Sequence, residues 1–488
     1  MRSASKLLSA SALQAFKWSM LGEAASRVIT PLTFLVLALL LVPEDFGVAA
    51  AATVVISLSL ALAEAGVGRA LVQGGGDTEP AASTAFWMTF FFGCIAAAVL
   101  VIVAPSLAAL FRDSRVSDVV RVLSLQCVLV GLCTVPAALL QRQLRFRDLF
   151  WVRSANTFLL CVVSISLAVT GKGYWALVFG TLAGQLVQTL MLWRRCRWMP
   201  RSFLDAKSAL LLIRFGRWAA LSALLGWFYT WADALIVGHY LGAHDMGLYR
   251  VGNTLVVALF GLILAPLLPV LFPLFSMHSG DLPAVRRDLA SVVRAIAVVS
   301  LPGGGLLVLA SPLADALLAT RGWGGIGMVI AILGATHGVA WLVGANGEAL
   351  RGAGKPRAEA LAMGGAIIGY LAAYVTAIQF GLEAFLWTRL GMAVFGVLVQ
   401  VAVARAVIQF PLRNWLQLAW RPLLVAVCLI VLHLTAVRFG DATSISHLVA
   451  TLFGLALYSL YLLVAEQRLL NIVLSARRQS TTDHTTRQ

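Results

Sequence analysis

Apolar stretches of about 20 residues recur along the whole chain, and short segments rich in charged residues, glycine or proline separate them. A transmembrane helix needs about 20 consecutive, mostly apolar residues to cross the hydrocarbon core of a bilayer. Dividing the chain at the polar breaks therefore predicts an all-α polytopic membrane protein with fourteen transmembrane helices. Their expected ranges are 18–41, 48–72, 82–104, 117–139, 150–170, 173–193, 214–240, 246–276, 288–310, 324–349, 357–380, 382–408, 416–437 and 444–465.

One of these stretches, 246–276, carries three prolines: Pro266, Pro269 and Pro273. Proline lacks the backbone N–H of a helical hydrogen bond, and its ring clashes with the preceding turn. The helix is therefore expected to bend or break near its end.

The composition agrees with this pattern and excludes a water-soluble fold. Of the 488 residues, 60% are hydrophobic and 12% are charged, whereas a soluble domain has roughly 45–50% apolar and about 25% charged residues. The net charge of +16 could suggest nucleic-acid binding, which requires basic residues clustered on one polar face. Here the basic residues separate apolar stretches, so no nucleic-acid partner is expected.

Lysine and arginine residues concentrate in alternate connections, such as 142–147, 194–207 and 351–357. Cationic loops are retained on the cytoplasmic side of the membrane. Because an even number of spans returns the chain to its starting side, both termini are expected to be cytoplasmic. The polar tail, 467–488, is expected to be disordered.

The pattern gives no indication of enzyme chemistry. The predicted external loops are too short to fold a catalytic domain, and the glycine-rich segments lack the GxxxxGK[ST] spacing of a phosphate loop. No set of nucleophile and base, paired carboxylates or metal ligands converges in the predicted topology. We expect a protein that is not an enzyme and needs no cofactor or metal.

The chain contains a candidate internal repeat with an offset of 200 residues. Aligning 35–55 with 235–255 without a gap pairs Leu41 with Leu241, Asp45 with Asp245, and Gly47 with Gly247. The basic segments 142–147 and 351–357 form a second pairing at a similar offset. A chance match among apolar residues is the alternative.

The repeat predicts two six-helix lobes, 1–213 and 214–412, followed by two further helices within 413–466. Six helices return the chain to the same side, so both lobes have the same orientation in the membrane. Repeats related by an axis along the membrane normal suit a central cavity that opens alternately to either side.

A charged side chain in the middle of a transmembrane helix costs about 2.5–3.5 kcal/mol, so such residues should face a partner or a wet cavity. Glu23 and Arg27 lie four residues apart in the first span. Two readings stay open: a local ion pair, or an anion site in the cavity at Arg27 with Glu23 as its counterion.

Polar residues also gather in the seventh, eighth and tenth spans. Tyr229 and Asp233 share one helical face, Arg250 and Asn253 lie one turn apart, and His337 and Trp341 are four residues apart. These are candidate cavity residues. The alternatives are that Trp227 and Trp231 anchor their helix at a membrane interface, and that His337 is a packed, hydrogen-bonded residue.

The sequence at 37–73, with P-E-D-F-G at 43–47, and the segment PAALLQRQLRFRDL at 136–149 resemble Wzx-type polysaccharide flippases of the MOP superfamily. The likeness is strongest to the colanic-acid and exopolysaccharide exporter branch and extends over nearly the whole chain. The second repeat departs from the motif and reads AHDMG at 243–247.

The resemblance implies a flippase of the bacterial inner membrane. Its substrate would be an oligosaccharide repeat unit linked to undecaprenyl diphosphate, moved to the periplasmic leaflet by alternating access coupled to an ion gradient, and a polysaccharide polymerase and co-polymerase would be its partners. The expected roles are diphosphate binding by Arg27 and Arg250, sugar binding by Asn253, Tyr229 and Trp341, and ion coupling by Glu23, Asp233 and His337.

Three alternatives stay open. A MATE-like antiporter of small cations would share the two lobes, but it would have twelve spans and a more acidic cavity. A lipid II flippase would share the fourteen-span plan. A membrane component that transports nothing would need neither duplicated lobes nor charges within its spans.

Overall fold

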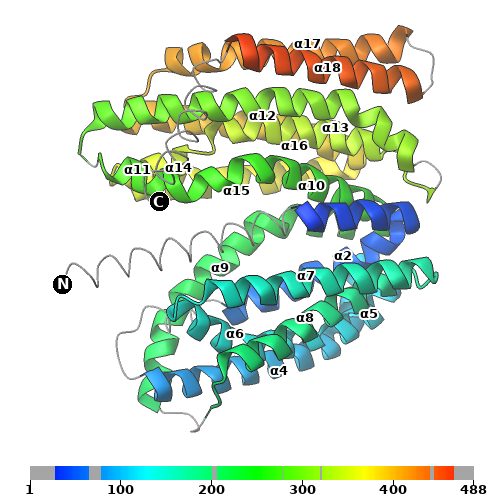
Figure 1. Ribbon diagram of the computed structural model, residues 1–488, viewed down its shortest axis with the longest axis vertical. Coiled ribbons are helices and arrows are strands. Elements are labelled where there is room, and N and C mark those ends of the chain that lie inside the picture. The colour runs from blue at the N-terminus through cyan, green and yellow to red at the C-terminus, as the bar shows by residue number, and fades with distance from the viewer. Residues whose placement is uncertain are drawn as a thin grey trace, which may run out of the picture. The chain divides into compact units, whose positions relative to one another are not determined.

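The computed structural model describes residues 28–64, 78–200, 206–278, 280–318, 321–439 and 444–465. Every regular element in these ranges is a helix (Figure 1). Glu23, Arg27 and the tail 467–488 lie outside the described residues, so the expectations for them stay predictions.

The helices follow the apolar stretches of the sequence closely. In chain order they are α2 (Pro43–Glu64), α4 (Thr78–Phe111), α5 (Arg115–Leu123), α6 (Leu125–Arg142), α7 (Phe146–Val169), α8 (Trp175–Cys196), α9 (Ala206–Leu241), α10 (Ala243–Leu264), α11 (Leu268–Ser276), α12 (Leu282–Leu318), α13 (Ile326–Ala340), α14 (Asn346–Gly352), α15 (Pro356–Ala377), α16 (Leu382–Val407), α17 (Leu412–Phe439) and α18 (Ser444–Ala465).

Within the described residues, twelve helical segments are long and apolar enough to cross a membrane. The expected first and seventh spans are not among them. A shorter apolar helix, Val28–Leu40, covers the end of the first, and α9 covers the range of the seventh. The chain is thus an all-α polytopic membrane protein with about twelve candidate spans, and the number fourteen stays a prediction.

The proline-rich stretch is broken, as the sequence predicts. Helix α10 ends at Leu264, a 3-10 turn follows at Ala265–Leu267, and α11 begins at Leu268. Pro266 lies in that turn, where it cannot donate a helical hydrogen bond. A second interruption was not predicted: the fourth expected span, 117–139, is divided at Ser124, between α5 and α6.

The chain packs as two compact units. The first comprises Met1–Ala258, Thr320–Trp323 and Tyr374–Leu382, and the second comprises Leu259–Ala319, Gly324–Ala373 and Glu383–Gln488. The expected division into lobes at residues 213 and 412 stays a prediction.

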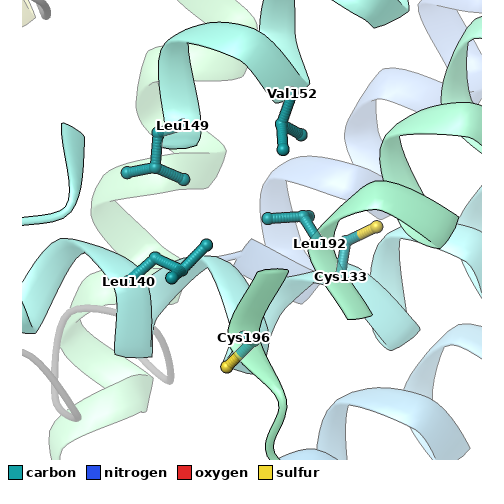
Figure 2. Close-up of a cluster of buried hydrophobic side chains, with 6 residues drawn as sticks. All are labelled: Cys133, Leu140, Leu149, Val152, Leu192 and Cys196. Atoms are coloured by element: carbon teal, nitrogen blue, oxygen red, sulfur yellow. The ribbon is translucent and has the colours of Figure 1, made fainter. Parts of the chain in front are cut away.

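In the first unit, α6, α7 and α8 pack around a sulfur-containing apolar cluster. Figure 2 shows its six side chains: Cys133, Leu140, Leu149, Val152, Leu192 and Cys196. Helix α4 packs on α6, where a Cβ on Gly131 would lie 2.6 Å from the carbonyl oxygen of Thr89. Small residues permit such close helix packing, which stabilises helix pairs in a membrane.

In the second unit, α12 is the central helix and packs on α13, α17 and α18. Gly304 of α12 lies against the backbone of α13, because a Cβ there would be 2.9 Å from the carbonyl oxygen of Gly334. Helices α17 and α18 lie side by side (Figure 1). They bury Leu429 and Ala450 against Leu309 of α12. Their other faces expose large apolar side chains such as Leu416 and Leu463, as expected of a surface that contacts lipid.

Candidate functional site

The first unit contains a cavity of about 220 Å³ between its helices. Phe34, Phe46, Ala49 and Leu160 contribute to its apolar walls. Its polar lining comes from five helices: Thr53 and Ser57 of α2, Gln126 of α6, Ser164 of α7, Thr181 of α8 and Arg250 of α10. Arg250 and Gln126 are costly in apolar helices, and their convergence with four hydroxyl side chains on one cavity indicates a binding site.

Arg250 is the cationic residue of this cavity. Its guanidinium carbon lies 4.3 Å from the centre of the Trp231 ring, a cation–π contact, and Asp233 acts on it electrostatically. The guanidinium takes part in none of the ion pairs within 4.0 Å found among the described residues. A cation held by an aromatic face keeps its charge and its N–H donors for an anionic ligand.

Asp233 has a structural partner close to Arg250. Its carboxylate accepts hydrogen bonds from the Tyr249 hydroxyl at 2.6 Å and from the backbone N–H of Ala234 at 2.6 Å. Asp233 therefore connects α9 to α10 beside the cation. The structure brings together two sequence-predicted residues, Arg250 and Asp233, in the first unit.

The neighbouring tryptophans lie inside the unit. Trp227 is 7% exposed and donates a hydrogen bond from its indole nitrogen to the Ser57 hydroxyl at 2.8 Å. Trp231 lies beneath Arg250. Both tryptophans thus contact residues that line the cavity, Ser57 and Arg250, and neither lines it directly.

The structure shows fewer polar contacts for the other candidate residues than for Arg250 and Asp233. The carboxamide oxygen of Asn253 is buried and has no hydrogen-bond partner among the described residues, while Tyr229 is 60% exposed. In the second unit, His337 of α13 stacks with Phe260 at 6.1 Å, and Trp341 begins the 3-10 turn Trp341–Val343. The expected roles of Asn253, Tyr229 and Trp341 in sugar binding, and of His337 in ion coupling, stay predictions.

A second feature of the first unit is a reciprocal contact between the start of α2 and the start of α10, which we call the α2–α10 junction (43–47 with 243–247). A Cβ on Gly47 would overlap the carbonyl oxygen of Ala243, and a Cβ on Gly247 would overlap that of Pro43. The two contacts interchange when 200 is added to or subtracted from each residue number. This is the relation expected of a two-fold axis, so it supports the repeat alignment.

The Glu44 carboxylate and the His244 imidazole, also 200 residues apart, meet at 2.8 Å in the same junction. Both lie in the first turn of their helices. The acid at the start of α2 is further favoured by the helix dipole, typically by about 0.3–1 kcal/mol at a surface. The carboxylate–imidazole contact therefore joins the two helix N-termini directly.

The remaining motif residues hold the start of α2 in place. The Asp45 carboxylate accepts a hydrogen bond from the backbone N–H of Tyr174 at 2.9 Å. Phe46 packs edge-on against Trp323 at 5.3 Å, and the Trp323 indole donates to the carbonyl oxygen of Leu41 at 3.0 Å. Each of the five motif residues thus has a structural role.

An ion pair beside this motif fixes the turn between α4 and α5. Burial raises the pKa of Asp113, but its hydrogen bonds and charge interaction with Arg115, 2.7 Å away, outweigh burial and hold the pKa below its usual value. The Arg115 guanidinium also lies 5.9 Å from the centre of the Tyr174 ring.

Sequence reasoning missed the hydroxyl and amide lining of the cavity. Ser164, Thr181 and Gln126 sit in apolar helices where serine and threonine commonly bond to their own backbone, so nothing in the pattern distinguishes them. The pairing of Glu44 with His244 had a usable signal, because the repeat offset already aligned the two positions.

Comparison with solved structures identifies the fold. The chain aligns with "Lipid II flippase MurJ, inward closed conformation" at a TM-score of 0.75 and 13% identity, covering 93% of this chain and 100% of that one. It aligns with a multidrug resistance MATE family transporter of the MOP superfamily at a TM-score of 0.60 and 14% identity, covering 79% and 98%. The fold is that of the MOP superfamily.

Sequence comparison identifies the family. Residues 36–326 match the family described as "Polysaccharide biosynthesis protein", and the chain belongs to that family. It is 26% identical over 479 residues to the "Succinoglycan biosynthesis transport protein ExoT" of Rhizobium meliloti (strain 1021), covering 94% of both chains. It is 20% identical over 303 residues to the "Lipopolysaccharide biosynthesis protein WzxC" of Escherichia coli (strain K12), covering 60% and 61%.

These matches confirm the expected polysaccharide-biosynthesis family, and the structural alignments confirm the expected fold.

Proposed function

We propose that the protein moves oligosaccharide repeat units linked to undecaprenyl diphosphate from the cytoplasmic to the periplasmic leaflet of a bacterial inner membrane. The observation that supports this most is Arg250, a cation without an ion-pair partner among the described residues, at a polar-lined cavity between apolar helices. A diphosphate crossing the bilayer needs a positive partner, because the hydrocarbon core offers none.

The proposed mechanism is alternating access. Loops 42–47 and 241–247 are predicted to be external, which makes the α2–α10 junction the periplasmic gate in its closed state. Opening this gate requires the loss of the Glu44–His244 pair and of the two glycine contacts. Both termini would be cytoplasmic, and a polymerase and co-polymerase would receive the cargo on the periplasmic side.

Deletion of the gene tests the function. We expect the deletion strain to accumulate undecaprenyl-diphosphate-linked repeat units in the inner leaflet and to lose most of its polymer, measured by lipid extraction and mass spectrometry. The wild-type gene on a plasmid should restore both. Normal polymer output without accumulation contradicts the proposal.

Ion coupling is proposed for Asp233, with Glu23 and His337 as further candidates. A titratable side chain within an apolar helix can link proton movement to a conformational change. Removing the coupling group should flatten the pH dependence of transport into proteoliposomes. The matched variants are Asp233→Asn, Glu23→Gln and His337→Ala; an unchanged pH profile in all three contradicts proton coupling through these groups.

A further inference from the structure

We propose that one end of the first unit binds anionic phospholipids of the cytoplasmic leaflet. The surface consists of the α6–α7 turn (142–147) and the end of α8 with the residues after it (194–199), and we call it the basic rim. The orientation predicted for the chain places this end in the cytoplasmic leaflet, whose anionic lipids attract cationic surfaces. None of the residues of the basic rim lines the cavity that contains Arg250, so the lipid contact is separate from the proposed transport site.

The basic rim carries a large excess of positive charge. Its two segments contain no acidic residue and six arginines, of which all but Arg145 are exposed: Arg142, Arg145, Arg147, Arg194, Arg195 and Arg197. The adjacent Asp148 carboxylate contacts Arg145 at 2.7 Å and Arg195 at 2.6 Å. This one carboxylate joins the two segments into a single surface and leaves most of the positive charge uncompensated.

Large apolar side chains are exposed beside these arginines. Met199 is 74% exposed, Leu144 is 46% exposed, and Trp151 of α7 is 48% exposed. Cationic and apolar side chains on one surface are typical of a protein segment that enters the headgroup region of an anionic membrane, where tryptophan is also favoured. A free phosphate would contact the arginines alone, whereas a phospholipid also covers Leu144 and Met199.

The backbone at Leu144 independently indicates a role for its exposed side chain. Leu144 has a φ of +56°, a left-handed conformation that is unfavourable for a residue with a Cβ. Its N–H donates to the carbonyl oxygen of Gln141 at 3.0 Å. The matching turn of the second unit makes the same bond at 3.0 Å, from Gly354 to Arg351, with a φ of +74° at the glycine. Since glycine closes this turn without strain, the leucine at 144 points to a function of the side chain.

The matching turn of the second unit lacks both features of the basic rim. The segment 348–359 holds three basic and two acidic residues, and Arg351 contacts the carboxylates of Glu348 at 2.7 Å and Glu359 at 3.3 Å. Gly354 presents no apolar side chain. The two turns thus share a backbone conformation and differ in the groups that would bind a lipid, which makes the second turn an internal control.

The test measures lipid binding to the purified full-length protein by native mass spectrometry, with phosphatidylglycerol as the anionic probe and phosphatidylcholine as the zwitterionic one. The wild type should prefer phosphatidylglycerol. Arg194→Gln/Arg197→Gln should weaken phosphatidylglycerol binding about tenfold, because two cationic contacts with the headgroup are lost. The matched control, Lys355→Gln/Arg357→Gln, removes two exposed charges from the second turn and should weaken binding less than about twofold.

Replacing Leu144 with glycine separates a lipid contact from a structural role. The variant Leu144→Gly should raise the thermal midpoint in detergent, because it relieves the left-handed strain. The same variant should weaken phosphatidylglycerol binding about threefold, because an apolar contact with the lipid is lost. A lower thermal midpoint with unchanged lipid binding would show that Leu144 serves the fold alone.

Equal affinity of the wild type for the two lipids overturns the lipid site and leaves an acidic protein as the ligand of the basic rim. Equal losses in the two double variants also overturn it, because general positive charge would then account for the binding. The assay contains no cargo lipid, so its outcome is independent of the flippase proposal, which the deletion strain tests separately.

Discussion

Replacing Gly47 with alanine is expected to reduce polymer export more than about tenfold while leaving the amount of protein in the membrane unchanged. The new Cβ would overlap the backbone carbonyl of Ala243, so the closed α2–α10 junction could form only after the backbones moved apart. Overpacking of this kind typically costs about 1–3 kcal/mol, and 1.4 kcal/mol corresponds to a tenfold change in an equilibrium. Gly247→Ala should act alike, because it makes the reciprocal contact with Pro43.

Formation of the junction can be measured by cross-linking cysteines placed at Glu44 and His244, whose side chains meet in the structure. In a background without the native cysteines, oxidation should cross-link the pair and stop export, and a reductant should restore it. Adding Gly47→Ala should lower the cross-linking yield. Gly364→Ala is the matched control, since a Cβ there has no neighbouring atom within 4 Å.

An effect of Gly47→Ala on membrane insertion, with an unchanged cross-linking yield in the protein that remains, would contradict a gating role. The glycine contact would then be needed for folding only.

Replacing Arg250 with glutamine is expected to reduce transport of the lipid-linked substrate about 10- to 100-fold, because one or more charge-assisted hydrogen bonds to the diphosphate are lost. Two lipids should bind more weakly to the purified variant: the repeat-unit lipid extracted from the deletion strain, and synthetic undecaprenyl diphosphate without sugar. Arg250→Lys should recover part of the activity, since lysine keeps the charge but not the planar donors.

The chain offers a matched control in another span. Arg421 of α17 also lies over an indole, with its guanidinium carbon 5.3 Å from the Trp420 ring, and it does not line the cavity. Arg421→Gln should leave binding of both lipids unchanged. Equal losses in the Arg250 and Arg421 variants would contradict a substrate contact at Arg250 and indicate a general need for these arginine–tryptophan pairs.

Apolar periodicity predicted most of the helices because a bilayer imposes one length and one composition on every span. The break at Pro266 was predictable for the same reason, since its cause is local. The break at Ser124 was not, because serine is tolerated within helices and its effect depends on what the helix packs against.

Only the charged residues of the candidate site could be predicted from the sequence, because burying a charge costs free energy. Arg250 and Asp233 were found because a charge in an apolar stretch demands a partner or water. The cavity hydroxyls were not found because a serine or threonine in a span costs little when it bonds to its own backbone, as Thr181 does. These hydroxyl residues can be recognised as cavity residues only in the folded structure, where five helices contribute the polar lining.

The pseudo-symmetry of the α2–α10 junction has a consequence for how such a chain could arise from a duplicated ancestor. In a homodimer of one half, position 44 would face its own copy across the dyad, and two glutamates there would repel. Fusing the halves into a single polypeptide allows the two copies to mutate separately, so that an imidazole can stand opposite the carboxylate. Glu44 and His244 thus form a complementary pair that a strictly symmetric homodimer could not form, because both of its copies would carry the same residue at this position.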